Sequence, residues 1–136
     1  MKTKALLFVL LFGLSIIKAQ TAPTIVVVRF TTDYPQCTPV WAADDCYYRA
    51  EYFDKCNSTQ RAIVYDRAGY IIHSDWKMTN YYPTRINDYF AATYPGESFQ
   101  VWSSLDDLGC QSYYIMRDSE KIWFDRNGKT KNYLKC

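Results

Sequence analysis

The sequence has little of what metal or redox chemistry requires. It contains a single histidine, His73, and none of its five cysteines stands in a Cys-x-x-Cys pair. Zinc sites and thioredoxin-type sites both rely on closely spaced cysteine or histidine side chains. We therefore expect no metal ion, no cofactor and no catalytic residues. His73 lies between Ile72 and Ser74, and we expect it at the surface of a strand, not as a ligand or a base.

The chain also lacks a second long apolar run. The one that it has, residues 5–17, follows two lysines and precedes Ala19, which is the order of a secretory signal peptide. The run is too short to span a bilayer. We predict that residues 1–19 are removed and that residues 20–136 are released into the periplasm or outside the cell, with no membrane insertion.

A strong excess of charge of one sign is missing as well. The formal net charge is +2, and removing the three lysines of residues 1–19 lowers it to −1. Nucleic-acid binding depends on neutralising phosphates with basic side chains. The mature part therefore gives no reason to expect a nucleic-acid partner.

What the chain does contain is an internal repeat with an offset of about sixty residues. At one constant offset, the series Pro23, Thr24, Phe30, Tyr34 and Pro35 occurs again as Pro83, Thr84, Phe90, Tyr94 and Pro95. With small slips, Trp41 pairs with Trp102, Tyr47-Tyr48 with Tyr113-Tyr114, and Asp66–Gly69 with Asp125–Gly128. We expect the repeated aromatic residues to pack in the same place in each half. The mature part is then a single domain of two units, about 22–80 and 81–136.

Each unit opens with a predicted helix. In the second unit a proline is followed by apolar residues at helical spacing, which indicates a helix over 83–94. Residues 23–35 align with it without a gap, although the β-branched run Ile25–Val28 favours a strand by local propensity. We follow the repeat and predict a helix there too, because tertiary context overrides weak local preferences.

Short segments of strand composition follow each helix and are separated by turns rich in Asp, Asn and Gly. The predicted strands are 38–43, 46–53, 60–65 and 70–76 in the first unit and 98–104, 111–117, 120–124 and 129–133 in the second. Short connections favour antiparallel neighbours, and a unit of about sixty residues buries too little surface to be stable alone. We predict an α+β fold: a tandem duplication of a helix plus an antiparallel β-meander, with one shared sheet and two helices on one face.

The order of the aromatic motifs resembles a known family. The first copy is Phe30–Pro35, Trp41, Tyr47-Tyr48 and Tyr65–Gly69, and the second is Phe90–Pro95, Trp102, Tyr113-Tyr114 and Phe124–Gly128. This pattern is similar to that of the beta-lactamase-inhibitor-like, PepSY-like domain family of secreted Bacteroidota proteins. The resemblance implies tandem helix-plus-meander units with a concave binding sheet, and it offers no catalytic residues. A likeness of fold does not establish a function.

All five cysteines, Cys37, Cys46, Cys56, Cys110 and Cys136, lie in the mature part, where an oxidising compartment favours disulfides. The odd count leaves at least one of them unpaired or paired between chains. The sequence does not fix the connectivity. We predict a bridge between Cys46 and Cys56, because these two residues flank a strand and a loop that could return alongside each other.

Aromatic residues make up 18% of the chain, enough to supply both a core and a recognition surface. Tyr and Trp combine apolar area with a polar tip, which suits interfaces. The aromatic residues that do not repeat are the better candidates for binding, because shared packing does not explain them. Our predicted binding residues are Tyr52, Tyr70, Trp76, Tyr81, Tyr82 and Trp123.

Three functional hypotheses follow. The first is a non-enzymatic, inhibitor-like binding protein that holds a protein or peptide on its sheet face or at the seam between units. The second is a glycan-binding module, which stacked aromatic residues on one exposed strand face would favour. The third is a thiol-dependent enzyme, which an unpaired Cys110 beside a carboxylate or His73 in a cleft would favour. We expect the acidic pairs Asp44-Asp45 and Asp106-Asp107 to be solvated loop residues.

Overall fold

Seven strands form one antiparallel sheet in which the order in space is the order along the chain. The computed structural model describes residues 21–118 and 120–133, so the predicted signal peptide, residues 1–19, lies outside the described residues. The elements are α1 (Thr24–Asp33), β1 (Val40–Asp44), β2 (Tyr47–Asp54), β3 (Thr59–Tyr65), β4 (Ile71–Lys77), α2 (Thr84–Thr93), β5 (Val101–Asp106), β6 (Gln111–Arg117) and β7 (Glu120–Phe124). The predicted α+β fold is confirmed.

The segment 129–133 is not the strand that its composition predicts. It makes one isolated bridge, between Thr130 and Phe124, and one further backbone hydrogen bond, from the Lys131 N–H to the Trp123 carbonyl. The turn that precedes it brings the chain back along β7, but regular pairing does not continue. The predicted eighth strand is therefore wrong, and β7 is the last strand among the described residues.

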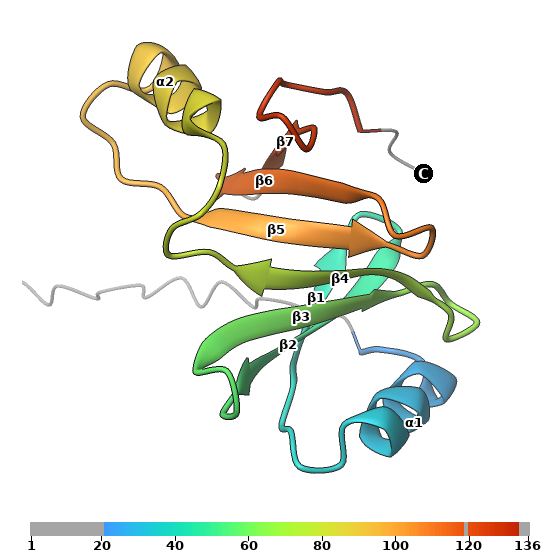
Figure 1. The fold of residues 1–136 in the computed structure, drawn as a ribbon. Coiled ribbons are helices and arrows are strands. Elements are labelled where there is room, and N and C mark those ends of the chain that lie inside the picture. Colours follow the sequence, from blue (N-terminus) through green and yellow to red (C-terminus); the bar gives the residue numbers. More distant parts are fainter. Residues whose placement is uncertain (1–20, 119, 134–136) are drawn as a thin grey trace, which may run out of the picture.

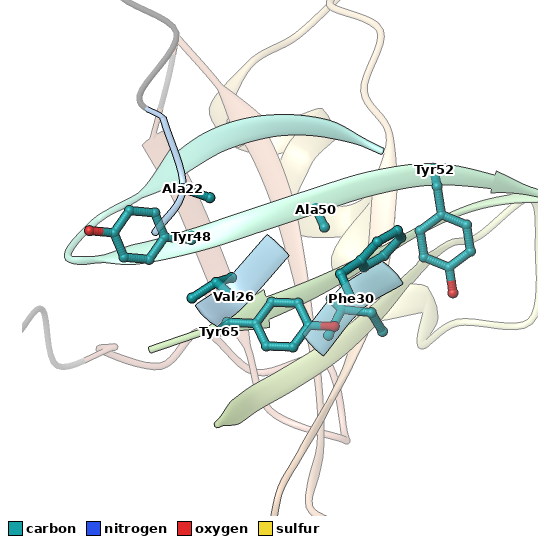
Figure 2. Packing of buried hydrophobic residues seen from close by; sticks show 8 residues of the cluster. Ala22, Val26, Phe30, Tyr48, Ala50, Tyr52 and Tyr65 are labelled. Carbon is teal, nitrogen blue, oxygen red and sulfur yellow. The ribbon is translucent and has the colours of Figure 1, made fainter. Parts of the chain in front are cut away.

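Helix α1 forms in spite of its β-branched residues because burial of its apolar face stabilises the helix. Val26 and Phe30 are four residues apart, so they lie on one face of the helix, and both are fully buried. Figure 2 shows them packed among residues of β2 and β3, and the Phe30 ring lies 5.5 Å from that of Tyr52. Burying two such side chains contributes roughly 3–6 kcal/mol. Over the run Ile25–Val28, β-branching costs a few tenths of a kcal/mol per residue, or about 2 kcal/mol in all, which the burial outweighs.

Helix α2 repeats this arrangement at the other end of the sheet (Figure 1). Its buried residues are Ile86 and Phe90, which pack against β5, β6 and β7. Each helix follows a proline with extended backbone, and each ends where the next tyrosine N–H donates to the phenylalanine carbonyl at 2.8 Å. The two helix ends are thus alike in detail, while a common origin of the two units stays a prediction.

Both helices cover the same face of the sheet. Residues directly opposite each other on paired strands share a face. Ile63, which packs on α1, is opposite Ser74, and Ser74 is opposite Leu105. Val101, which packs on α2, is four residues before Leu105 in the same strand and so shares its face. The prediction of two helices on one face is confirmed, and no helix of residues 21–118 or 120–133 covers the other face.

The repeated tryptophans do not occupy equivalent places. Trp41 is opposite Ala50 and packs on the α1 core, whereas Trp102 is opposite Tyr114 on the helix-free face. Pairing Trp41 with Trp102 requires a slip of one residue, and a slip of one residue turns a strand side chain to the opposite face. The expectation that these two residues pack in the same place is therefore wrong. The constant offset pairs Trp41 with Val101, which does share its face.

Candidate functional site

The helix-free face of the sheet is the inner face of a strong curl. Lys121 of β7 and Asp44 of β1 lie on strands at opposite edges of the sheet, yet their Nζ and Oδ2 atoms are 2.5 Å apart. In a flat sheet these edges would be separated by six strand spacings, or about 29 Å. The ion pair therefore brings the two edges together and makes the helix-free face concave.

A buried polar network occupies this concave face. We call it the Asp75 network; it consists of Arg49, His73, Asp75 and Tyr114. Arg49 donates through Nη1 to Asp75 Oδ2 at 2.7 Å and to the Tyr114 hydroxyl at 2.8 Å. The Tyr114 hydroxyl donates to Asp75 Oδ2 at 2.7 Å, and His73 Nδ1 lies 2.6 Å from Asp75 Oδ1. All four side chains are buried.

Small residues on the intervening strands allow this network to form. Arg49, Asp75 and Tyr114 come from β2, β4 and β6, each separated from the next by one strand, or about 10 Å across two spacings. On the two strands in between, β3 and β5, the residues opposite Asp75 are Ala62 and Ser104. Neither side chain is large enough to fill the space above Asp75. Long side chains from β2 and β6 therefore reach over them to the carboxylate.

The network keeps its central charges ionised. Burial alone would raise the pKa of the Asp75 carboxyl, but the interaction with His73 and the charges of Arg49 and Lys121 lower it to about 2. Burial disfavours the charged form of Arg49, yet Tyr114 and Asp75 outweigh that effect and hold its pKa above the ordinary value. Burial, followed by the charge of Asp75, raises the pKa of the Tyr114 phenol well above the ordinary value. The helix-free face thus holds a buried ion pair, Arg49–Asp75, in which both groups are charged at neutral pH.

A cavity of about 990 Å³ lies between the two edges of the sheet, next to this network. We call it the edge cavity. Its lining includes Ala42, Asp44, Arg49, Lys121, Trp123 and Tyr133. Burial lowers the pKa of Lys121, partly offset by the charges of Asp44 and Asp75. The lining is thus a mixture of aromatic, acidic and basic groups, which suits recognition of a polar ligand more than a purely apolar one.

One donor in the lining has no partner. Among the described residues, three buried side-chain atoms make no hydrogen bond: Arg49 Nη2, Arg61 Nε and the Tyr65 hydroxyl. Of these three residues, Arg49 is the one that lines the edge cavity. Its side chain is 3% exposed. Buried polar groups in native proteins nearly always have a partner, and the Arg49 guanidinium also lies over the Trp102 ring, with Cζ 4.6 Å from its centroid.

The predicted binding residues do not form one surface. Tyr52 is buried against α1, which leaves it no surface for a partner, and Trp76 lies on the same helix-covered face. Tyr70 and Tyr81 are strongly exposed, but they flank β4 at opposite ends. Trp123 alone lines the edge cavity. The remaining predicted residue, Tyr82, packs against the α2 core.

The charged residues of the site were not predicted from the sequence. His73 was expected at the surface, but it is 4% exposed and bound to Asp75, so that expectation is wrong. Asp44, expected to be a solvated loop residue, pairs with Lys121. One signal was available: His73 and Asp75 are two residues apart in a strand, and so they share a face. Arg49 gave no such signal, because its partners come from other strands.

The predicted disulfide between Cys46 and Cys56 is also wrong. Cys56 is a free, exposed cysteine in the turn after β2, whereas Cys46 lies in the turn before it. The eight residues of β2 separate them, which at about 3.3 Å per residue is more than 25 Å. A disulfide requires Cα atoms less than about 7 Å apart.

A second, smaller cavity of about 220 Å³ brings together residues that the thiol hypothesis named. Cys110, which is free and exposed, lines it together with His73 and Asp106. Asp106 is opposite His73 in the sheet and accepts a hydrogen bond from the Cys110 backbone N–H at 2.7 Å. None of the groups of histidine, cysteine and acidic residues in the described part of the chain has an arrangement that could hold a metal ion.

Comparisons with known proteins place the fold. No family model and no curated protein matches the chain. A DUF2874 family protein from Bacteroides uniformis ATCC 8492 matches in structure with a TM-score of 0.57 and 19% identity, covering 82% of this chain and 88% of that one. A candidate periplasmic protein from Bacteroides eggerthii DSM 20697 matches with a TM-score of 0.55 and 15% identity, covering 82% and 87%. A BLIP-like protein from Bacteroides fragilis NCTC 9343 matches with a TM-score of 0.46 and 11% identity, covering 82% and 84%.

Identities this low show the fold alone. No helix of the described residues has the length and apolar character needed to cross a membrane. The resemblance to secreted Bacteroidota proteins that the sequence indicated is confirmed as a likeness of fold: the chain has the fold of the DUF2874 family proteins of Bacteroides.

Proposed function

We propose that this protein is a non-catalytic binding protein, acting in the periplasm or outside the cell, that holds an extended segment of a protein or peptide in the edge cavity. The observation that carries the proposal is the edge cavity itself, whose lining mixes charged and aromatic residues, includes Arg49, and is bordered by a free strand edge. The predicted signal peptide and the periplasmic description of the similar Bacteroides eggerthii protein support export.

The free strand edge is that of β1. Among the described strands β1 pairs with β2 alone. An edge strand presents a row of backbone N–H and C=O groups, and an extended peptide can add to it as a further strand. Ala42 and Ala43 are exposed there and line the cavity. Their small side chains allow another backbone to come close.

Charge in the cavity favours a ligand with an oxygen acceptor. A buried donor that stays without a partner costs about 1–3 kcal/mol, and a carboxylate or amide oxygen of a bound peptide would recover part of that cost at Arg49 Nη2. Lys121 and Lys131 add positive charge to the lining, while Glu51 and Glu120 add negative charge. This balance fits a polar peptide better than a polyanion.

The glycan alternative has less support. A sugar-binding platform needs open aromatic faces, but the ring of Trp123 is stacked against that of Tyr133 at 4.4 Å with 11° between the planes. The strongly exposed Tyr70 and Tyr81 are separated by the length of β4. The lining of the edge cavity is the mixed polar kind that favours the peptide hypothesis.

Thiol chemistry at Cys110 is a second candidate, because Cys110 is free and shares the small cavity with His73 and Asp106. His73 Nδ1 is occupied by Asp75, which would leave its other ring nitrogen for a thiol. Alkylation rates separate the two proposals. On the binding proposal, Cys110 and the equally free and exposed Cys56 react at similar rates near pH 6.5; a Cys110 that reacts at least tenfold faster, and that slows in a His73→Phe variant, favours the thiol function.

Selection of peptides on the folded protein tests the binding proposal. A random peptide library is selected against residues 20–136, and the enriched peptides are tested on two variants. Ala42→Trp fills the edge cavity, whereas Ala91→Trp places the same side chain on the exposed surface of α2. We expect enriched peptides to carry Asp, Glu, Asn or Gln and to lose binding to Ala42→Trp alone. Equal binding to both variants, or binding of oligosaccharides without any enriched peptide, contradicts the proposal.

A further inference from the structure

Helix α1 has an apolar outer surface that the core does not explain. Within the run Ile25–Val28, Val26 is the residue that packs in the core. Ile25 and Val28 are each 57% exposed. An exposed β-branched residue lowers the propensity for a helix and adds no packing to the core. The apolar character of this outer surface therefore has another cause.

Helix α2, at the other end of the sheet, supplies an internal comparison (Figure 1). At the constant offset of sixty residues, Ile25 corresponds to Arg85 and Val28 corresponds to Asp88. Both of these residues of α2 are charged and exposed. A helix that packs on this sheet in the same way thus carries charges at these two positions. The fold itself does not require apolar residues there.

Thr32 extends the apolar surface of α1. Its hydroxyl donates to the Val28 carbonyl at 2.8 Å, so its polar group is satisfied within the helix. Ile25, Val28 and Thr32 occupy positions i, i+3 and i+7, which is the spacing of a seam that packs against a second helix. We call these three residues the α1 seam. The outer surface of α1 is built like one half of a helix pair.

The α1 seam fits a second copy of itself in antiparallel orientation. With a two-fold axis beside Val28, the two valines meet, and Ile25 of each copy lies against the smaller Thr32 of the other. Arg29 lies beside the same axis, but its Nε donates to Asp33 Oδ2 at 2.7 Å. The two arginines that approach each other therefore bring no net charge to the contact.

The two ends of the α1 seam carry opposite charges. The turn after β3 lies against the first end, because a Cβ placed on Gly69 would be 3.7 Å from Ile25 Cγ1. This turn carries the exposed Arg67. The other end carries Asp33 and the last carbonyl groups of the helix, which have a partial negative charge. Antiparallel packing brings the basic turn of each copy to the negative end of the other copy's helix.

We propose that this protein forms a weak two-fold dimer in which the α1 seams of two copies pack antiparallel. A ten-residue helix buries less than the roughly 800 Å² per partner of a standard interface. We therefore expect a dissociation constant on the order of 100 μM. The described lining of the edge cavity includes no residue of α1. The dimer thus carries two edge cavities that the α1 contact does not cover, and the inference does not depend on what they bind.

Sedimentation of the mature protein between about 10 μM and about 1 mM tests the dimer. The exposed thiols of Cys56 and Cys110 are first alkylated, so that they cannot link two copies. Val28→Asp gives α1 the residue that α2 has at this position, and Ala92→Asp places the same side chain on the exposed surface of α2 as the matched control. We expect the mean mass of the wild type and of Ala92→Asp to rise toward that of a dimer, while Val28→Asp stays monomeric.

Two results of this experiment overturn the proposal. One is a wild type that stays monomeric up to about 1 mM, which would leave the α1 seam to a helix of another protein. The other is a Val28→Asp protein that associates as strongly as the wild type.

Nuclear Overhauser contacts in the wild-type protein test the orientation without any variant. Ile25 and Thr32 are seven residues apart in α1, and so about 10 Å apart along the helix axis. A contact between their methyl groups therefore arises between two copies. We expect this contact at about 1 mM, where the dimer is populated. A dimer without it contradicts the antiparallel packing of the α1 seams.

Discussion

Replacing Asp75 by asparagine removes the central charge of the Asp75 network while nearly preserving the shape of the side chain. Arg49 then remains 3% exposed with no anion at the position where Asp75 Oδ2 now lies 2.7 Å from its Nη1. Breaking a buried ion pair by removing one partner costs about 3–5 kcal/mol, and because Glu51 Oε2 stays 3.3 Å from Arg49 Nε and compensates part of its charge, we expect the lower end, about 3 kcal/mol. With urea m-values of about 1–3 kcal/mol/M, the midpoint of urea unfolding should fall by at least about 1 M.

The matched control is Asp118→Asn. Asp118 pairs with Arg117 at 2.8 Å, nearly the same distance, but its side chain is 81% exposed. Exposed ion pairs contribute only about 0.2–1 kcal/mol. If Asp75→Asn were to shift the urea midpoint no more than Asp118→Asn does, the network would not stabilise the curled sheet and the reasoning would be refuted.

Three further outcomes follow. Asp75 has a folded pKa of about 2, below its unfolded value near 3.9, so its contribution of about 2 kcal/mol is present above pH 4 and lost as the pH falls toward 2; because the pKa values of Asp54 and Asp125 are lowered too, urea titrations from pH 2 to 5 should show an acid loss in both proteins that is about 2 kcal/mol larger in the wild type than in Asp75→Asn, and equal losses would contradict this. Gly128→Ala should cost about 1–3 kcal/mol more than Gly109→Ala, because both glycines have φ near +80° but a Cβ at Gly128 would lie 2.7 Å from Pro83 Cβ; equal urea midpoints would contradict this. Phe30→Ala should cost about 3–5 kcal/mol, and a smaller loss in calorimetry would mean that α1 contributes little to the core.

The fold was predictable because its evidence is local or repeated. The prolines before the helices, the helical spacing of apolar residues and the Asp-x-x-Gly turns are each patterns of a few residues. The repeat with an offset of about sixty residues predicted the two-unit organisation. The turns Asp66–Gly69 and Asp125–Gly128 confirm this, since in both the aspartate Oδ1 accepts N–H bonds from residues two and four positions ahead. The repeat also correctly predicted α1, against its β-branched residues.

The site was not predictable, because its contacts depend on the curl of the sheet. Arg49 and Asp75 are on strands with a third strand between them, and Asp44 and Lys121 are on opposite edges of the sheet. No spacing in the sequence encodes these distances. The lone histidine was judged by its apolar neighbour Ile72, although its partner is two residues ahead in the same strand.

A chemical-shift map of the ¹⁵N-labelled mature protein with a peptide enriched by selection would locate the binding site residue by residue. If the peptide binds in the edge cavity, the largest amide and guanidinium shifts fall on β1, Val40–Asp44, and on Arg49, with small changes at α1 and α2. Shifts centred on the helix-covered face, or on the exposed Tyr70 and Tyr81, with β1 and Arg49 unchanged, would contradict the claim that the edge cavity is the binding site.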